Sequence, residues 1–258
     1  PKGTTLTMQM SFDNSADNPR NPSQPPQRVV GGDGTGDEMS HLWIQLLVDN
    51  DDDLLALQQV EWEHKLTKNP RDWKPPHNLG ELHLSRQNYG QAIHHFQQAL
   101  VLRPNSVDTH NDLGVALKAV GNNKDAIGHY QQALKYDPDC DRAHYNLGNA
   151  LVLSGKMEDA VSHLRQAAKL TPHWAEFHLQ LGMLLLNQRQ YDESIVHCRR
   201  TLEIDSGLAE AYFGLGAGLA GKKQWKEAID QLELALQIDS GLPEARLILA
   251  RIHRAQGR

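Results

Sequence analysis

The sequence has little cysteine, few aromatic residues, no long apolar run and no excess of positive charge. Two cysteines among 258 residues are too few for a disulfide framework. No stretch approaches the roughly 20 apolar residues that cross a bilayer, so we expect no membrane span. The formal net charge of -6 gives no overall attraction to a phosphate backbone, so we expect no nucleic-acid partner.

The strongest feature that is present is an internal repeat. A triplet ending in Leu-Gly recurs every 34 residues, at 78–80, 112–114, 146–148, 180–182 and 214–216. Later in each unit comes a small residue, a bulky residue four positions on, and a second small residue three positions further. The bulky residues are Phe96, Tyr130, Leu164, Cys198 and Leu232. This spacing is typical of one face of a helix.

The repeated glycine indicates how each unit is packed. A glycine inside a helix costs about 1 kcal/mol relative to alanine, so its recurrence favours close approach of a second helix. We expect the small residues of that second helix to make the contact. Pro104, Pro138 and Pro172 follow the first three units' second helices and would end them.

With these motifs the sequence resembles the tetratricopeptide repeat (TPR) family. The units would be residues 73–106, 107–140, 141–174, 175–208 and 209–242. The resemblance implies a mainly all-α, right-handed superhelical solenoid of helical hairpins over residues 73–242. Residues 49–72 would be a linker and N-capping helix, and residues 243–258 a C-terminal capping helix or half repeat. Ser194, Cys198 and Thr201 replace more apolar residues of the family, which predicts looser packing in the fourth unit.

The family resemblance also implies a binding surface, because its first helices usually line a groove for an extended peptide or a partner helix. The candidate residues at those positions are Asn78, Arg142, Tyr145, Asn146, Asn149, Leu179, Met183 and Phe213. They predict a groove that is polar in the early units and apolar in the late ones. The alternative is that several of these side chains only pack between neighbouring helices.

Some members of the family hold a terminal carboxylate with a clamp of lysine and asparagine. Here His77 stands where the lysine is expected and Asp112 where the second asparagine is expected. We therefore do not expect a carboxylate clamp.

Fourteen histidines raise the question of a metal. One series recurs at 95, 129, 163 and 197, and another at 110, 144 and 178. Equivalent residues of successive repeats lie on neighbouring helices about 10 Å apart, whereas one zinc ion needs its nitrogen ligands at about 2.1 Å. A single series therefore cannot share an ion, and we attribute it to repeat duplication and expect no cofactor in this chain.

Residues 1–48 have a different character and predict a β-rich remnant. Residues 4–12 and 42–48 alternate as strands do, and the chain starts at Pro1 without an initiator methionine, so we expect a fragment of a longer protein. The string from Gly31 to Ile44 resembles the last strand of the C-terminal domain of copper type II, ascorbate-dependent monooxygenases. That resemblance implies that Met39 is a copper ligand.

The implied copper site is incomplete in this chain. The monooxygenase family also uses a His-x-His arrangement at this copper, and the sequence contains none. Copper is thus expected only in a longer parent protein. Under this resemblance the protein would be extracytoplasmic, and otherwise cytoplasmic, so the sequence leaves localisation open.

Three functional hypotheses follow from the sequence. The first is a scaffold that binds a protein or peptide, and the second is the C-terminal part of a larger copper monooxygenase-like enzyme with an appended TPR module. The third is a self-assembling structural solenoid. We find no catalytic triad, phosphate loop or dinucleotide motif, so we do not expect this chain to be an enzyme by itself.

Overall fold

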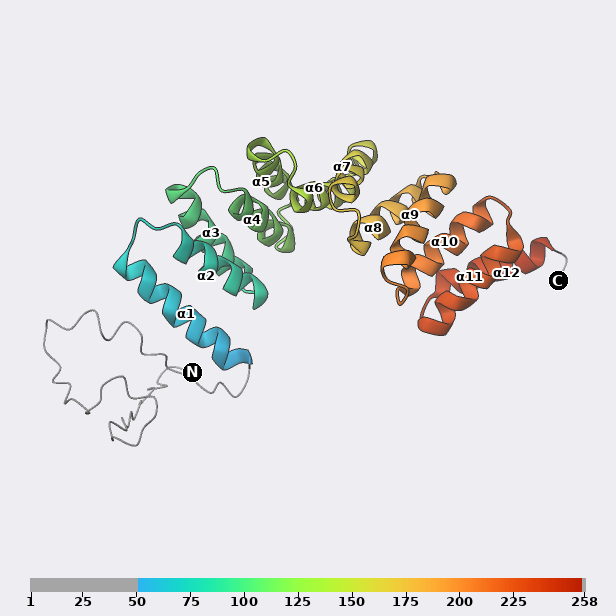
Figure 1. The fold of residues 1–258 in the computed structure, drawn as a ribbon, viewed down its shortest axis with the longest axis horizontal. Coiled ribbons are helices and arrows are strands. Elements are labelled where there is room, and N and C mark those ends of the chain that lie inside the picture. The colour runs from blue at the N-terminus through green and yellow to red at the C-terminus, as the bar shows by residue number, and fades with distance from the viewer. Residues whose placement is uncertain (1–50, 257–258) are drawn as a thin grey trace, which may run out of the picture. The chain divides into compact units, whose positions relative to one another are not determined.

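The computed structural model describes residues 51–256, which form twelve α-helices and, within this range, no strand (Figure 1). The predicted all-α solenoid of helical hairpins is confirmed. The predicted β-rich segment, residues 1–48, lies outside the described residues. The helices are α1 (Asp51–Lys68), α2 (Lys74–Ser85), α3 (Tyr89–Leu102), α4 (Val107–Ala119), α5 (Asn123–Tyr136), α6 (Asp141–Leu153), α7 (Met157–Leu170), α8 (Ala175–Asn187), α9 (Tyr191–Ile204), α10 (Ala209–Gly221), α11 (Trp225–Ile238) and α12 (Pro243–Ala255).

The helices pair into five hairpins, α2–α3, α4–α5, α6–α7, α8–α9 and α10–α11. Each second helix also packs on the first helix of the next hairpin, and first helices contact each other in α2–α4, α4–α6, α8–α10 and α10–α12. At the two ends, α1 packs on α2, and α12 packs on α10 and α11. No helix in the described range is long and apolar enough to span a membrane.

The loop inside each hairpin turns through the left-handed backbone region at one equivalent residue. The φ angles there are 82° at Gly121 and 74° at Gly155, but also 58° at Gln87, 59° at Arg189 and 61° at Lys223. Glycine adopts this conformation without steric cost, whereas other residues do not. Three of the five loops therefore hold a strained residue where the other two hold glycine.

The repeated glycines lie where the two helices of a hairpin approach most closely. A Cβ added to Gly80, Gly114 or Gly148 would lie 2.5, 2.5 or 2.7 Å from the ring or branch carbons of Phe96, Tyr130 or Leu164. The close approach is confirmed, but the contact predicted for the small residues is made mainly by the bulky residue. The small residues instead keep the second helix near enough for that bulky side chain to reach the glycine.

The buried apolar side chains form two clusters that meet inside the fourth hairpin. The first runs from Ala92 in α3 to Leu185 in α8, and the second begins at Ile195 in α9 and continues to Ile252 in α12. Ser194 and Thr201 in α9 are fully buried, and the Ser194 hydroxyl donates to the carbonyl oxygen of Gly182 at 2.8 Å. Ser194 and Thr201 stand where the other hairpins carry alanine, so the large loss of apolar side chain in this hairpin is at Cys198, which replaces an aromatic residue or leucine.

Candidate binding site on the first helices

The predicted binding residues all lie on first helices of the hairpins, on α2, α6, α8 and α10. We use the term first-helix face for one set of side chains on α2, α4, α6, α8, α10 and α12. They are the second, fifth, sixth, ninth and twelfth residues of each repeat unit. Arg142 is exposed, whereas Asn78, Tyr145, Asn146, Asn149, Met183 and Phe213 are half-buried. Leu179 is only 7% exposed, so it mainly packs between helices.

Two of the predicted polar residues connect α6 to α4. The Arg142 guanidinium donates to Oδ1 of Asp108 at 2.6 Å. The Asn146 amide donates from Nδ2 to Oδ1 of Asn111 at 2.9 Å. Because the Arg142 pair is exposed, it contributes little to stability and remains available to a ligand.

Tyr145 connects α6 to α8. Its hydroxyl donates to Oε1 of Glu176 at 2.9 Å, and its ring lies 4.9 Å, centre to centre, from the ring of Phe177. Burial, together with the Glu176 charge, raises the pKa of Tyr145 to about 12. Tyr145 is therefore a fixed hydrogen-bond donor that is already engaged by Glu176.

The late part of the first-helix face is apolar. The Met183 sulfur would be 3.0 Å from a Cβ placed on Gly214, so the absence of a side chain at that glycine leaves room for methionine. Phe213 packs at the edge of the second core cluster and stays partly exposed. Leu247 on α12 is 51% exposed on the same face.

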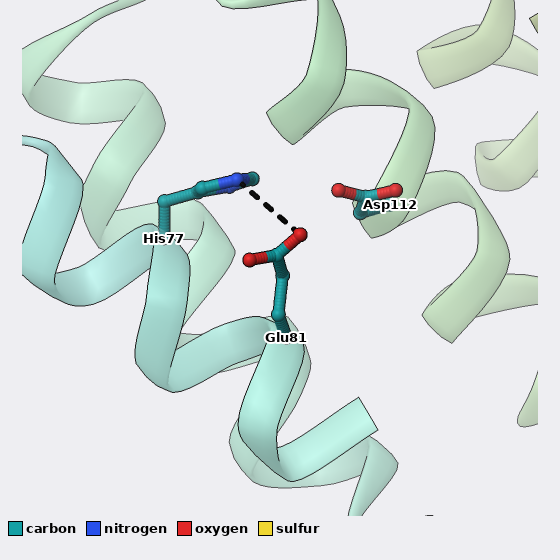
Figure 2. A group of neighbouring side chains, drawn as sticks. All are labelled: His77, Glu81 and Asp112. Carbon is teal, nitrogen blue, oxygen red and sulfur yellow. Dashed lines mark ion pairs between the residues drawn. The ribbon is translucent and has the colours of Figure 1, made fainter. Parts of the chain in front are cut away.

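The early part of the face holds a cluster that the sequence analysis did not assemble, made of His77, Glu81 and Asp112 (Figure 2). One ligand atom of each lies within 4.8 Å of the others. His77 and Glu81 are one turn apart on α2, and Asp112 faces them from α4. His77 and Asp112 are each 8% exposed, and burial raises the pKa of the Asp112 carboxyl, an effect that the Asn111 hydrogen bond partly offsets.

The orientation of His77 is fixed from the opposite side of its ring. Its Nδ1 lies 3.1 Å from the Thr109 hydroxyl, which in turn lies 2.8 Å from the Ser106 hydroxyl. Its Nε2 lies 3.7 Å from Oε1 of Glu81. One nitrogen and two carboxyl groups that converge in this way can receive a basic side chain or a divalent cation, and they would repel a carboxylate.

Two pockets open on this face. One has a volume of about 440 Å³ between α1 and α2, and its lining includes Trp62, Asn78 and Glu81. The other, of about 270 Å³, is lined by α10, α11 and α12, including Ala217 and Arg251 of the first-helix face. The first pocket shares Glu81 with the charged cluster, so the pocket and the cluster adjoin each other at the start of the solenoid.

The structure also joins the two histidine series that the sequence analysis considered separately. His110 faces His129, His144 faces His163, and His178 faces His197, with Nδ1 to Nδ1 distances of 3.0, 2.9 and 2.9 Å. Burial is the largest cause of the lowered pKa of His110, His129, His163, His178 and His197. The signal was present in the sequence as a separation of 19 residues in three consecutive units.

Two further sequence predictions concern sulfur. Cys140 and Cys198 are free, as expected, and Cys198 is buried against Gly182 and Gly214. Met39, the predicted copper ligand, lies outside the described residues.

Comparison with family models matches tetratricopeptide repeat models to residues 76–139, 111–173 and 154–209. Together they cover 76–209, slightly more than half of the 258 residues. A search of curated proteins finds no match.

Several solved structures have the same fold. YrrB, described as a TPR protein with an unusual peptide-binding site, is 24% identical with a TM-score of 0.63, and the match covers 71% of this chain and 95% of that one. PilF of Pseudomonas aeruginosa is 22% identical with a TM-score of 0.63, covering 73% and 87%. MamA is 25% identical with a TM-score of 0.58, covering 63% and 95%.

Proposed function

We propose, on the premise that this chain belongs to the tetratricopeptide repeat family, that it is an interaction scaffold whose first-helix face holds a segment of another protein. The observation that carries the proposal is the composition of that face. Half-buried polar and apolar side chains, among them Asn149, Met183 and Phe213, lie on successive first helices, and other residues of the first-helix face line both described pockets.

The chemistry of the face supports a particular kind of segment. At its early end, His77, Glu81 and Asp112 favour a lysine or arginine, because a basic group would stabilise the ionised form of a buried carboxyl. At its late end, Met183 and Phe213 favour an apolar side chain. The ligand is therefore a peptide or helix with one basic residue and, further along, at least one apolar residue.

The same cluster argues against recognition of a terminal carboxylate. A carboxylate placed near Asp112 would meet a buried carboxyl of the same sign, which disfavours the contact. The sequence-based expectation that there is no carboxylate clamp thus gains a physical reason.

The test is binding of a fluorescent peptide library to the whole chain, followed by anisotropy with variants. The triple variant Asn146→Ala, Met183→Ala and Phe213→Ala should weaken the best peptides at least tenfold. The matched control carries three truncations on exposed second-helix positions, Val101→Ala, Gln132→Ala and Val196→Ala. Equal affinity in both triple variants would refute the assignment of the face.

A second comparison tests the ligand class. Asp112→Asn should weaken peptides with a basic residue and leave apolar peptides of the same length unchanged. If Asp112→Asn strengthens or spares the basic peptides, the charged cluster is not their contact. The hypothesis of a larger copper monooxygenase-like enzyme rests on residues 31–44 and remains a prediction, as does self-association.

A further inference from the structure

The three histidine pairs have one geometry, repeated in the second, third and fourth hairpins. In each pair the first histidine is the fourth residue of its repeat unit, on the first helix, and the second is the twenty-third, on the second helix. The ring centres are 5.3, 5.1 and 5.2 Å apart, while the Nδ1 atoms are only 2.9–3.0 Å apart. The two Nδ1 atoms therefore lie between the rings and face each other.

A backbone carbonyl fixes the tautomer of the first histidine. Nε2 of His110, His144 and His178 lies 3.0, 3.0 and 3.2 Å from the carbonyl oxygen of Pro104, Pro138 and Pro172. A carbonyl can only accept a hydrogen bond, so Nε2 carries the proton and Nδ1 presents a lone pair to the partner ring. This is the arrangement in which metal-ligating histidines are held, with the second nitrogen donating to a carbonyl or carboxylate.

The second histidine of each pair has a carboxylate one helical turn earlier. These residues are Asp125, Asp159 and Glu193, four positions before His129, His163 and His197. In the fourth hairpin, Oε1 of Glu193 lies 3.8 Å from Nε2 of His197, the nitrogen that does not face His178. When Nδ1 of His197 binds an ion, its Nε2–H can donate toward that carboxylate.

The ring spacing fits a shared ion. Two imidazoles bound at about 2.1 Å to one tetrahedral ion have their ring centres about 5.3 Å apart and their nitrogens about 3.4 Å apart. The observed ring centres are already at 5.1–5.3 Å, but the Nδ1 atoms are at 2.9–3.0 Å and face each other, so both rings must turn and the two nitrogens must move apart before an ion can enter between them. Histidines of one series lie in different hairpins and are too far apart to share an ion, whereas the two histidines of a pair lie in the same hairpin and face each other.

We infer that each of the three pairs is a two-imidazole site for Zn²⁺, with its remaining coordination positions open to water or to a partner's side chains. Imidazole nitrogen is a preferred ligand of zinc, and an open site of this kind binds reversibly. The first and fifth hairpins lack the pair. In the first unit Pro76 replaces the first histidine, and His95 instead stacks on His83; in the fifth unit the two positions hold Tyr212 and Gln231.

The experiment compares zinc binding by isothermal titration calorimetry in three versions of the whole chain, each freed of metal with EDTA. The pair variant carries His129→Gln, His163→Gln and His197→Gln, since glutamine occupies the equivalent position in the fifth hairpin as Gln231. The control variant carries His64→Gln, His94→Gln and His173→Gln, three exposed histidines outside the pairs. Because His77, Glu81 and Asp112 are unchanged throughout, any zinc they bind cancels in the comparison.

We expect the pair variant to bind three fewer Zn²⁺ ions per chain than the wild type, and the control variant to bind as many as the wild type. Zinc should also raise the thermal midpoint more in the wild type than in the pair variant, because binding to the folded state stabilises it. If the pair variant loses only one or two ions, the inference holds only for the pairs that bound them, and single substitutions would identify these pairs. Equal zinc binding by the wild type and a folded pair variant, judged by circular dichroism, would overturn the inference.

Discussion

The contact between the repeated glycine and the bulky residue predicts different effects for the same substitution at two places. Gly148 lies in α6, where an added Cβ would be 2.7 Å from Cγ of Leu164 and 3.3 Å from the carbonyl oxygen of Ala160. Gly128 lies in α5, where an added Cβ meets nothing within 4 Å. Gly148→Ala and Gly128→Ala therefore differ only in what surrounds the new methyl group.

The magnitudes follow from two terms. Both substitutions gain about 1 kcal/mol of helix propensity. Gly148→Ala also overpacks a side chain that is only 1% exposed, and overpacking of this kind costs about 1–3 kcal/mol. Gly128→Ala should stabilise the protein by up to about 1 kcal/mol, and Gly148→Ala should be about 1–3 kcal/mol less stable than it.

The assay is urea unfolding followed by circular dichroism, together with amide hydrogen exchange in α6 and α7. The local measurement is needed because stacked repeats interact mainly with their neighbours and need not unfold in one step. Adding Leu164→Ala should remove the clash, so the double variant should be more stable than the sum of the two single effects predicts. If Gly148→Ala is as stable as Gly128→Ala by both measurements, the close contact does not limit the packing.

Three further predictions follow from burial. Burial raises the pKa of the Asp112 carboxyl above its ordinary value of 3.8, so the folded state loses stability as the pH rises from 3.8 through the raised pKa. Asp112→Asn removes this loss and should raise the urea midpoint at pH 7, and its advantage should be gone below about pH 3.8. Burial lowers the pKa of His178 and His197, so EDTA-treated protein should lose stability in thermal melts as the pH falls below 6.5, and His197→Gln should lose less. Burial raises the pKa of both thiols, that of Cys198 to about 11, but only Cys198 is fully buried; a chromogenic disulfide reagent should therefore modify Cys140 in the native protein and Cys198 only after unfolding.

The sequence allowed the repeat and the close approach of its two helices to be predicted because they depend on spacing along one helix, although the residue that makes the contact was not the one expected. A glycine and a bulky residue that recur every 34 positions are enough to place two helices in contact, and Gly80 and Phe96 meet in that way. The left-handed loop residues were not predicted. Only Gly121 and Gly155 indicate that conformation by their residue type, whereas Arg189 adopts it although arginine rarely does.

The histidine pairs and the charged cluster could not be predicted by the same reasoning, because they depend on how two helices are rotated against each other. His110 and His129 face each other only when α4 and α5 have one particular register. Asp112 likewise joins His77 from the next hairpin. His77 and Asp112, which stand where a carboxylate clamp has lysine and asparagine, instead lie together in the charged cluster.

The division of the core inside the fourth hairpin has a mechanical consequence. A pulling force on the two ends of a solenoid acts equally on every hairpin, so the hairpin with the least apolar contact between its helices should open first. In α8–α9 the bulky residue of the repeat is Cys198, and Ser194 and Thr201 stand beside it. Under tension we expect the chain to lengthen first at this hairpin, while α2 to α7 remain folded.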